Sequence, residues 1–329
     1  MPRTLSDWLA HIGQVHGRSI ELGLDRIKTV ARVLGAEPRS SIIVVGGTNG
    51  KGSTCAMIDS VLRCAGYRVG LYTSPHLLHF NERVRVNGAP VADEPLCRAF
   101  ERIEEARGAV SLTYFEFATL AAWVVFASVP LDAVILEVGL GGRLDAVNAF
   151  DADCAVLSSI AIDHVEYLGA DRERIGQEKS GIFRPGRPAI IADPHPPASV
   201  ADHARAVGAS IRLIGRDFGF GSGGGQWQYW SRCGEALARR SGLAYPALRG
   251  NRQLFNAAAA IAAIESLADR LPVAMQDFRR GLLEVEWPAR FQVLPGRPAV
   301  VLDVAHNAQA VEVLAENLLV RWRKVCEAL

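Results

Sequence analysis

The sequence predicts an α/β fold built around a mostly parallel β-sheet. Short runs of apolar and β-branched residues recur along the chain, and helical patterns stand between many of them. Such runs are typical of strands that are buried on both faces, and their alternation with helices indicates βαβ units. A glycine-rich turn also joins the first run to a helical pattern, which is the strand–loop–helix order of a phosphate-binding loop.

The elements follow from these patterns in chain order. Strands are expected over residues 41–47, 67–75, 132–140, 154–163, 188–194 and 298–306. Helices are expected over residues 53–65, 113–128 and 251–269, of which the first stops at Gly66 and the third is rich in alanine. Residues 215–235 mix glycines with aromatic residues, which fits either a mobile loop or a small antiparallel sheet at the edge of the main sheet.

Composition narrows the functional class. The formal net charge of the 329-residue chain is +1, so neither nucleic acid nor an anionic membrane is an expected partner. No apolar stretch approaches the ~20 residues of a membrane span, and the N-terminus lacks the pattern of a secretory signal. The six cysteines are scattered without a C-x-x-C pair, which indicates buried thiols in a reducing compartment. We therefore expect a cytoplasmic protein.

The stretch VVGGTNGKGSTCAMIDSVL, from Val44 to Leu62, departs from the usual phosphate-loop spelling G-x-x-x-x-G-K-[ST]. Val45 stands where that pattern has its first glycine, and the hydroxyl comes at Ser53, one position late. The physical parts are nevertheless present. Glycines expose backbone N–H groups, the following helix presents its positive end, and Lys51 supplies a cation. The alternative is a glycine-rich turn with a surface lysine.

Further polar residues stand where other strands end. In an open parallel sheet, ligands bind beyond the carboxyl ends of the strands. Ser74 follows one run, Glu137 ends the next, and His164 follows the run after that. Together with Ser53 and nucleotide phosphates, they could hold one or two Mg²⁺ ions. Taken singly, they also fit a Ser-Pro turn, a buried Glu–Arg pair and a structural histidine.

Downstream residues add weaker candidates. Lys179 follows Glu178 shortly before a glycine, which also fits an exposed charge pair on a helix. Asn256 lies early in a predicted helix, where its amide could contact a base or cap the helix. The phrase "WPARFQ" offers Arg290, and "LDVAHN" offers Asp303, His306 and Asn307 just past an apolar strand.

Several phrases occur together and in one order, namely GTNGKGS, SPHL, NERVRV, LTYFEFATLAA, VILEVGLGGRLDAVN, DHVEYLG, EKSGIFR, ARFQ and DVAHN. This series resembles the folylpolyglutamate synthase family, especially the bifunctional dihydrofolate synthase/folylpolyglutamate synthases of the wider Mur-ligase-like superfamily. The resemblance runs from about residue 5 to residue 318. The unusual loop is similar to that superfamily's own phosphate loop, G-T-N-G-K-G-S.

The resemblance implies roles for individual positions. It implies ATP contacts for Thr48, Asn49, Gly50, Lys51, Gly52, Ser53, Asn256, Arg290, Asp303 and His306. It implies metal ligation by Ser53, Ser74, Glu137 and His164, and contacts to a pterin substrate by Thr113, Tyr114, Phe115, Glu116, Leu144, Asp145 and Ala146. The implied catalytic residues are Lys51, His164 and Lys179, the last resembling a lysine that becomes carbamylated in this superfamily.

The implied fold is a Mur-ligase-type ATP-binding domain over residues 1–286, followed by an incomplete Rossmann-like C-terminal domain that begins at residues 287–329. The implied activity is ATP-dependent addition of L-glutamate to dihydropteroate or to the γ-glutamyl tail of a reduced folate, through an acyl phosphate. We expect a monomer that uses Mg²⁺ and small-molecule substrates. The alternatives are a Mur-type ligase acting on another carboxylate, and a truncated, inactive ATP-binding protein.

Overall fold

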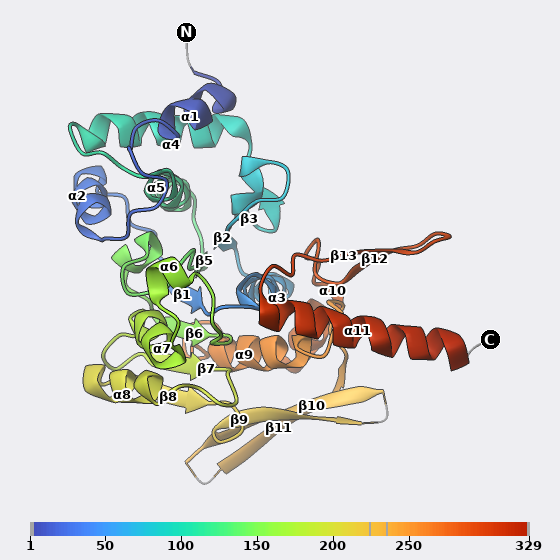
Figure 1. Cartoon of the computed structure of the whole chain (residues 1–329). Helices are drawn as coiled ribbons and strands as arrows, with labels where there is room; N and C mark the ends of the chain where they lie inside the picture. The colour runs from blue at the N-terminus through green and yellow to red at the C-terminus, as the bar shows by residue number, and fades with distance from the viewer. Residues whose placement is uncertain (1–2, 224, 235, 328–329) are drawn as a thin grey trace.

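A computed structural model describes residues 3–223, 225–234 and 236–327. Its centre is an eight-stranded sheet in the order β4-β3-β2-β5-β1-β6-β7-β8 (Figure 1). The strands are β1 (Ser41–Gly46), β2 (Val69–Tyr72), β3 (Val84–Val86), β4 (Ala89–Pro90), β5 (Ala133–Glu137), β6 (Cys154–Leu157), β7 (Pro188–Ile191) and β8 (Ser210–Leu213). Strands β2, β5, β1, β6, β7 and β8 run parallel, and β3 and β4 form an antiparallel edge. The predicted α/β fold with a mostly parallel sheet is confirmed.

Helices cover both faces of this sheet, as apolar strands that are buried on both sides require. The helices are α1 (Leu5–Ile12), α2 (Asp25–Leu34), α3 (Lys51–Cys64), α4 (Asp93–Arg107), α5 (Tyr114–Ala127), α6 (Val165–Leu168), α7 (Arg172–Ser180), α8 (Ala198–Val207), α9 (Gln253–Glu265), α10 (Met275–Glu284) and α11 (Ala308–Glu327). One core cluster joins the sheet to α1, α2, α4, α5, α7 and α8, and the other joins it to α3, α9 and α10. None of the helices in the described ranges is both long and apolar enough to cross a bilayer.

Within 215–235, residues 218–223 and 226–233 form strands of an antiparallel sheet, so the mobile-loop alternative is wrong. This sheet is separate from the main sheet and does not extend its edge. It consists of β9 (Phe218–Gly223), β10 (Gln226–Cys233) and β11 (Ala236–Ala244) and packs against α9. Trp227 and Tyr229 alternate along β10 and are buried, and the Tyr229 hydroxyl donates to Glu265 of α9 at 2.8 Å. The aromatic residues therefore fix this sheet on the helix beneath it.

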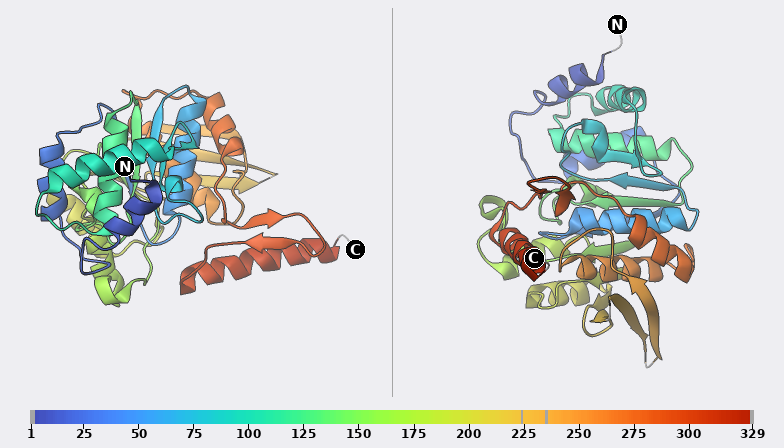
Figure 2. Two further views of the ribbon diagram at one scale, coloured as in Figure 1. Left: turned by 90° about the horizontal axis from the view of Figure 1, so that it is seen from above. Right: turned by 90° about the vertical axis from the view of Figure 1, so that its right-hand side faces the viewer.

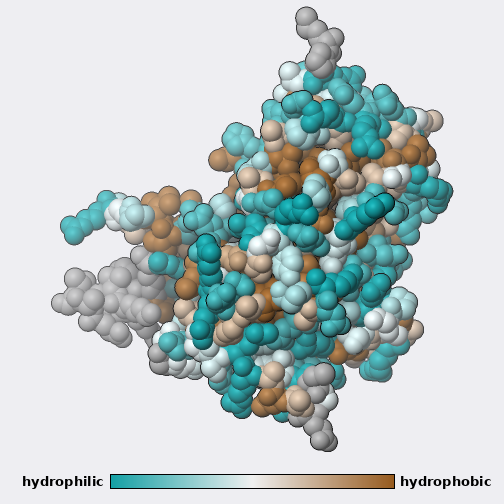
Figure 3. Space-filling view, turned by 180° about the vertical axis from the view of Figure 1, so that it is seen from behind, coloured by the Kyte–Doolittle hydropathy of each residue, from teal (hydrophilic) through white to brown (hydrophobic). Residues whose placement is uncertain are grey.

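The apolar run 298–306 was expected to form a strand buried on both faces, and that prediction is wrong. Its strand, β13 (Val300–Leu302), pairs with β12 (Gln292–Leu294) in a two-stranded antiparallel sheet outside the main sheet. Val300 is 47% exposed and Leu302 is 41% exposed, because the described residues supply no second layer over them. We call β12, β13 and α11 the C-terminal arm, which projects from the body in two views (Figures 1 and 2) and carries visible apolar surface (Figure 3).

Candidate active site

The glycine-rich loop lies between β1 and α3, at the carboxyl edge of the sheet. Gly47 has φ 138° and Gly50 has φ 88°, conformations that other residues rarely adopt. A Cβ on Gly47 would also lie 2.1 Å from the Ser158 hydroxyl oxygen. Gly50 precedes α3 without a side-chain cap, so the N–H groups of the first helical turn lack that partner. This is the geometry of an anion-binding helix start.

Two glycines of the loop also make room for side chains from distant segments. A Cβ on Gly50 would lie 2.5 Å from the amide oxygen of Asn256, at the start of α9. A Cβ on Gly52 would lie 2.9 Å from Nε1 of Trp287 and 3.4 Å from Nη2 of Arg290. The fold therefore brings Asn256 and Arg290, both predicted ATP contacts, to the phosphate loop.

Two lysines meet at the loop carbonyls. Lys51 Nζ donates to the carbonyls of Gly47 and Thr48, at 3.2 and 3.0 Å, and Lys179 Nζ donates to the same Gly47 carbonyl at 2.9 Å. Burial, followed by the charge of Lys51, lowers the pKa of Lys179 to about 7. Lys179 is thus not part of an exposed charge pair, and Glu178 pairs instead with Arg143 at 2.7 Å.

Glu137 ends β5 inside the protein. Its Oε2 accepts a hydrogen bond from the Ser74 backbone N–H at 3.1 Å. Burial raises the pKa of the Glu137 carboxyl, against the opposing effect of Lys51. Within the described part of the chain, no lysine, arginine or histidine nitrogen lies within 4.0 Å of this carboxylate, so the predicted alternative of a buried Glu–Arg pair is wrong.

The candidate ligands around Glu137 are mainly oxygen atoms, which bind hard cations such as Mg²⁺ better than soft ones. The described ranges contain no group of three or more histidine, cysteine or acidic side chains that could hold a metal ion. A metal ion at Glu137 would therefore take most of its ligands from hydroxyl groups, phosphate oxygens and water, as Mg²⁺ does in nucleotide sites. A buried carboxylate without a cationic partner is the feature that such an ion would neutralise.

The other two predicted metal ligands, Ser53 and His164, differ in their burial. Ser53 is buried in the first turn of α3. His164 is exposed, has φ 49°, and its backbone N–H donates to the Asp163 carboxylate at 2.8 Å. Within the described ranges, no hydrogen bond or ion pair joins His164 to Glu137. The structure therefore joins Ser74 to Glu137, and ligation by all four residues stays a prediction.

The C-terminal arm contacts the loop edge through amide side chains. Asn307 Nδ2 donates to Asn49 Oδ1 at 3.0 Å and to Asp163 Oδ2 at 2.9 Å. Asn49 Nδ2 in turn donates to Oε1 of Gln309 at 2.8 Å. The sequence marked Asn307 as a polar residue past a strand, but only the fold shows that it contacts Asn49.

Three predicted nucleotide contacts, Arg290, Asp303 and His306, lie just before β12 or just after β13. Asp303 accepts hydrogen bonds from the backbone N–H groups of Phe291 and Ala305, at 2.7 and 2.8 Å. Burial lowers the pKa of Arg290, while Glu137 and Asp303 act in the opposite direction. His306 bonds through Nδ1 to the Val304 carbonyl and is exposed.

The predicted pterin segment surrounds the start of α5. Thr113 and Glu116 form a reciprocal capping box, and Glu116 also pairs with Arg26 at 3.2 Å. The Phe115 ring packs against Gly139, where a Cβ would lie 2.5 Å from it. Tyr114 lies near the guanidinium of Arg83, 5.6 Å from the ring centroid.

Residues 144–146 are the second part of the predicted pterin segment. Asp145 accepts hydrogen bonds from the N–H groups of Leu140 and Val147, at 2.8 and 3.0 Å, and burial raises its pKa to about 6. The Leu144 carbonyl accepts from Gly23, and Ala146 is buried. The Asp145 carboxylate therefore holds the backbone on both sides of residues 144–146 in place.

Sequence reasoning missed two side chains at this edge. Arg83 is buried, donates to Nδ1 of His76 at 2.8 Å and lies over Phe80 and Tyr114. Trp287 contacts Gly52 from a linker that follows α10. The phrases NERVRV and WPARFQ contained both residues, but only the tertiary structure shows which neighbours they meet.

Comparisons with known proteins find relatives of this chain within one protein family. Residues 45–264 match the family model of the Mur ligase middle domain. The dihydrofolate synthase/folylpolyglutamate synthase of Escherichia coli (strain K12) is 44% identical over 315 residues, which are 95% of this chain and 72% of that protein. Its counterpart in Haemophilus influenzae is 39% identical, over 98% of this chain and 75% of that protein.

Solved structures lead to the same group. The structure described as E. coli FolC in complex with DHPP and ADP has a TM-score of 0.89 and 43% identity, over 95% of this chain and 73% of that chain. A bifunctional folylpolyglutamate synthase/dihydrofolate synthase with Mn, AMPPNP and L-glutamate bound has a TM-score of 0.88 and 43% identity, over 96% of this chain and 75% of that chain.

Proposed function

This chain belongs to the Mur ligase family and, within it, to the dihydrofolate synthase/folylpolyglutamate synthases, and we propose that it is an ATP-dependent ligase that adds L-glutamate to dihydropteroate and to folates. The observation that carries the proposal is that Lys51 and Arg290 converge on a glycine-rich helix start beside Glu137. Cations around an anion-binding loop, next to a buried carboxylate, suit a nucleotide polyphosphate with a divalent ion.

The reaction needs a carboxylate to approach a polyanion. The substrate carboxylate attacks the γ-phosphorus of ATP, giving an acyl phosphate and ADP. The α-amine of glutamate then attacks the acyl carbon and displaces phosphate. Lys51 and Arg290 lower the electrostatic cost of the first step, because their charges offset those of the phosphate oxygens.

We assign the divalent ion to Ser53, Ser74, Glu137 and His164. The buried, unpaired carboxylate of Glu137 supports this assignment, and so does the Ser74 N–H that orients it. Bound there, Mg²⁺ would supply positive charge to the phosphate oxygens. Mn in a relative's structure shows that a divalent ion accompanies the nucleotide in that protein.

Lys179 is proposed to carry a carbamate. An amine with a pKa of about 7 is substantially neutral at neutral pH, and the neutral form is the one that attacks CO₂. The resulting carboxylate would lie beside Lys51, which favours the anion. ¹³C-bicarbonate with NMR detection tests the assignment: we expect a carbamate signal that grows as the pH rises through 7. An equal signal in Lys179→Met would contradict it.

We further propose that residues 1–286 form the ATP-binding body and that residues 287–329 begin a second domain. The separate sheet of the C-terminal arm supports this boundary. The protein is proposed to act in the cytoplasm as a monomer on ATP, L-glutamate and a pterin or folate acid, with Thr113–Glu116 and Leu144–Ala146 next to that acid.

The decisive experiment measures ADP release from this 329-residue chain, with dihydropteroate or tetrahydrofolate, in the presence and absence of L-glutamate. The proposal predicts release that depends on both the acid and glutamate. Release with a different acid or amino acid would indicate a Mur-type ligase instead. ATP binding without glutamate-dependent ADP release would indicate an inactive nucleotide-binding protein.

A further inference from the structure

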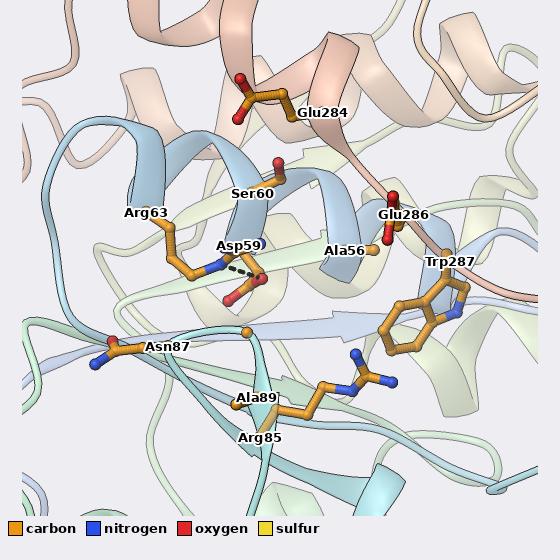
Figure 4. A pocket seen from close by; sticks show the side chains of 11 residues that line it. Ala56, Asp59, Ser60, Arg63, Arg85, Asn87, Ala89, Glu284, Glu286 and Trp287 are labelled. Carbon is orange, nitrogen blue, oxygen red and sulfur yellow. Dashed lines mark hydrogen bonds and ion pairs between the residues drawn. The ribbon is translucent and has the colours of Figure 1, made fainter.

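The linker between α10 and β12 passes beside the phosphate loop and carries Trp287. Val285 anchors the start of this linker in the core, where it is 2% exposed, and Trp287 is half-buried two residues later. The guanidinium of Arg85, on β3, lies 4.9 Å from the centroid of the Trp287 ring. Figure 4 shows this guanidinium beside the indole.

The same indole contacts the nucleotide-binding loop. Its Nε1 would lie 2.9 Å from a Cβ on Gly52, and Nη2 of Arg290 would lie 3.4 Å from that Cβ. Trp287 is therefore placed between the sheet edge at Arg85 and the first turn of α3. Arg290, three residues along the linker, contacts the same turn.

Arg85 has few other fixed partners. Its Nε donates to the Glu82 carbonyl at 3.4 Å, and the described ranges place no carboxylate oxygen within 4.0 Å of its guanidinium. Its backbone is held by the pairing of β3 with β2, opposite Leu71. The side chain is thus a cation on a rigid strand with the indole as its aromatic partner.

A cavity of about 390 Å³ lies alongside this pair (Figure 4). Its lining includes Asp59, Arg63, Glu284 and Glu286, together with Arg85 and Trp287. The indole packs against the core cluster that includes α3, and its other side borders this open space. On the open side, the contact with Arg85 restrains it.

We propose that Arg85 and Trp287 are positioning residues that hold the linker so that Arg290 stays on the phosphate loop. This inference rests on the proposed ATP-binding function. Neither residue is assigned a contact with the substrate. When the stack is removed, the linker gains freedom to move toward the cavity, and Arg290 spends less time at Gly52.

The test measures affinity of the full chain for AMPPNP with Mg²⁺ by calorimetry. Arg85→Ala and Trp287→Ala are each expected to weaken binding about 3- to 30-fold, the range that the loss of a cation–π contact predicts. Trp287→Phe keeps a ring for Arg85 and should retain most of the affinity. The matched control is Arg232→Ala, which removes a similar arginine–tryptophan contact on the distant β10 and should leave binding unchanged.

A double-mutant cycle separates positioning from a general loss of stability. In an Arg290→Lys background, Arg85→Ala should weaken AMPPNP binding less than about twofold, because Arg85 acts through Arg290. The inference is overturned if Arg85→Ala and Trp287→Ala bind as wild type does, or if Arg85→Ala costs as much in the Arg290→Lys background. If the wild-type chain itself fails to bind AMPPNP, the proposed function fails instead.

Discussion

The phosphate-loop edge and the C-terminal arm use similar sequence patterns and reach opposite degrees of burial. At the loop edge, β1 lies between β5 and β6, with helices over both faces, and Val44 and Val45 are buried. In the arm, a comparable apolar run forms β13, which has one partner strand and remains half exposed. An apolar run therefore predicts a strand, whereas its burial depends on the layers that surround it.

The two regions also differ in how they are held. The loop takes a backbone conformation that requires glycine at Gly47 and Gly50. It is fixed by hydrogen bonds from the Ser158 and Ser159 hydroxyls to the Asn49 carbonyl and by the sheet behind it. The arm contacts this edge through side-chain amides, among them Asn307. We therefore expect mutations at the loop edge to change chemistry strongly, and mutations in the arm to change docking modestly.

The largest effect is expected for Lys51→Ala. Loss of the cation beside the transferring phosphate should reduce glutamate-dependent ADP release by about 10³-fold or more, the size of effect known for an arginine that stabilises transition-state charge in phosphoryl transfer. Lys28→Ala, an exposed lysine on α2, is the matched control and should behave as wild type. Wild-type turnover of Lys51→Ala would remove the loop from the active site.

Glu137→Gln should come next. It keeps the shape of the side chain and removes the charge that would face the cation, so the Mg²⁺ concentration for half-maximal ADP release should rise tenfold or more, on the order of metal-site mutations. Glu101→Gln changes an exposed glutamate of α4 and should have no effect. An unchanged Mg²⁺ titration would exclude Glu137 from the metal site.

Lys179 should make stability depend on pH. Its folded-state pKa of about 7 lies below its ordinary value of 10.5, so the folded chain binds fewer protons than the unfolded chain between these values. Stability should therefore rise with pH across this window, by up to about 1.4 kcal/mol per pH unit. Urea unfolding in CO₂-free buffer measures the slope. Lys179→Met should lose this contribution, and an identical slope in the variant would contradict the buried, neutral amine.

Asn307→Ala should have the smallest effect and should concern the arm alone. Removing its bonds to Asn49 and Asp163 should weaken docking by about 1 kcal/mol, or roughly fivefold. Hydrogen exchange of amides in β12, β13 and α11 reports this loosening. Gln14→Ala, an exposed amide far along the chain, serves as the control. Unaltered exchange in the arm would mean that other contacts hold it.

The sequence alone determined the features that depend on neighbours along the chain. The order of strands and helices, the capped start of α5 at Thr113 and the glycine-rich helix start at Gly50 follow from local propensities and backbone sterics. Because strands of a parallel sheet end at one edge, the sequence also predicted that Ser53, Ser74, Glu137 and His164 share a region. The structure joins Ser74 to Glu137, whereas His164 is exposed.

The tertiary structure decided what depends on contacts between distant segments. The burial of Lys179 and the packing of Trp287 and Arg290 against Gly52 join residues more than a hundred positions apart. The exposure of β13 depends on which layers the described residues place around it. Local patterns carry no information about such pairings, because the free energy of each contact depends on which surfaces the fold places opposite each other.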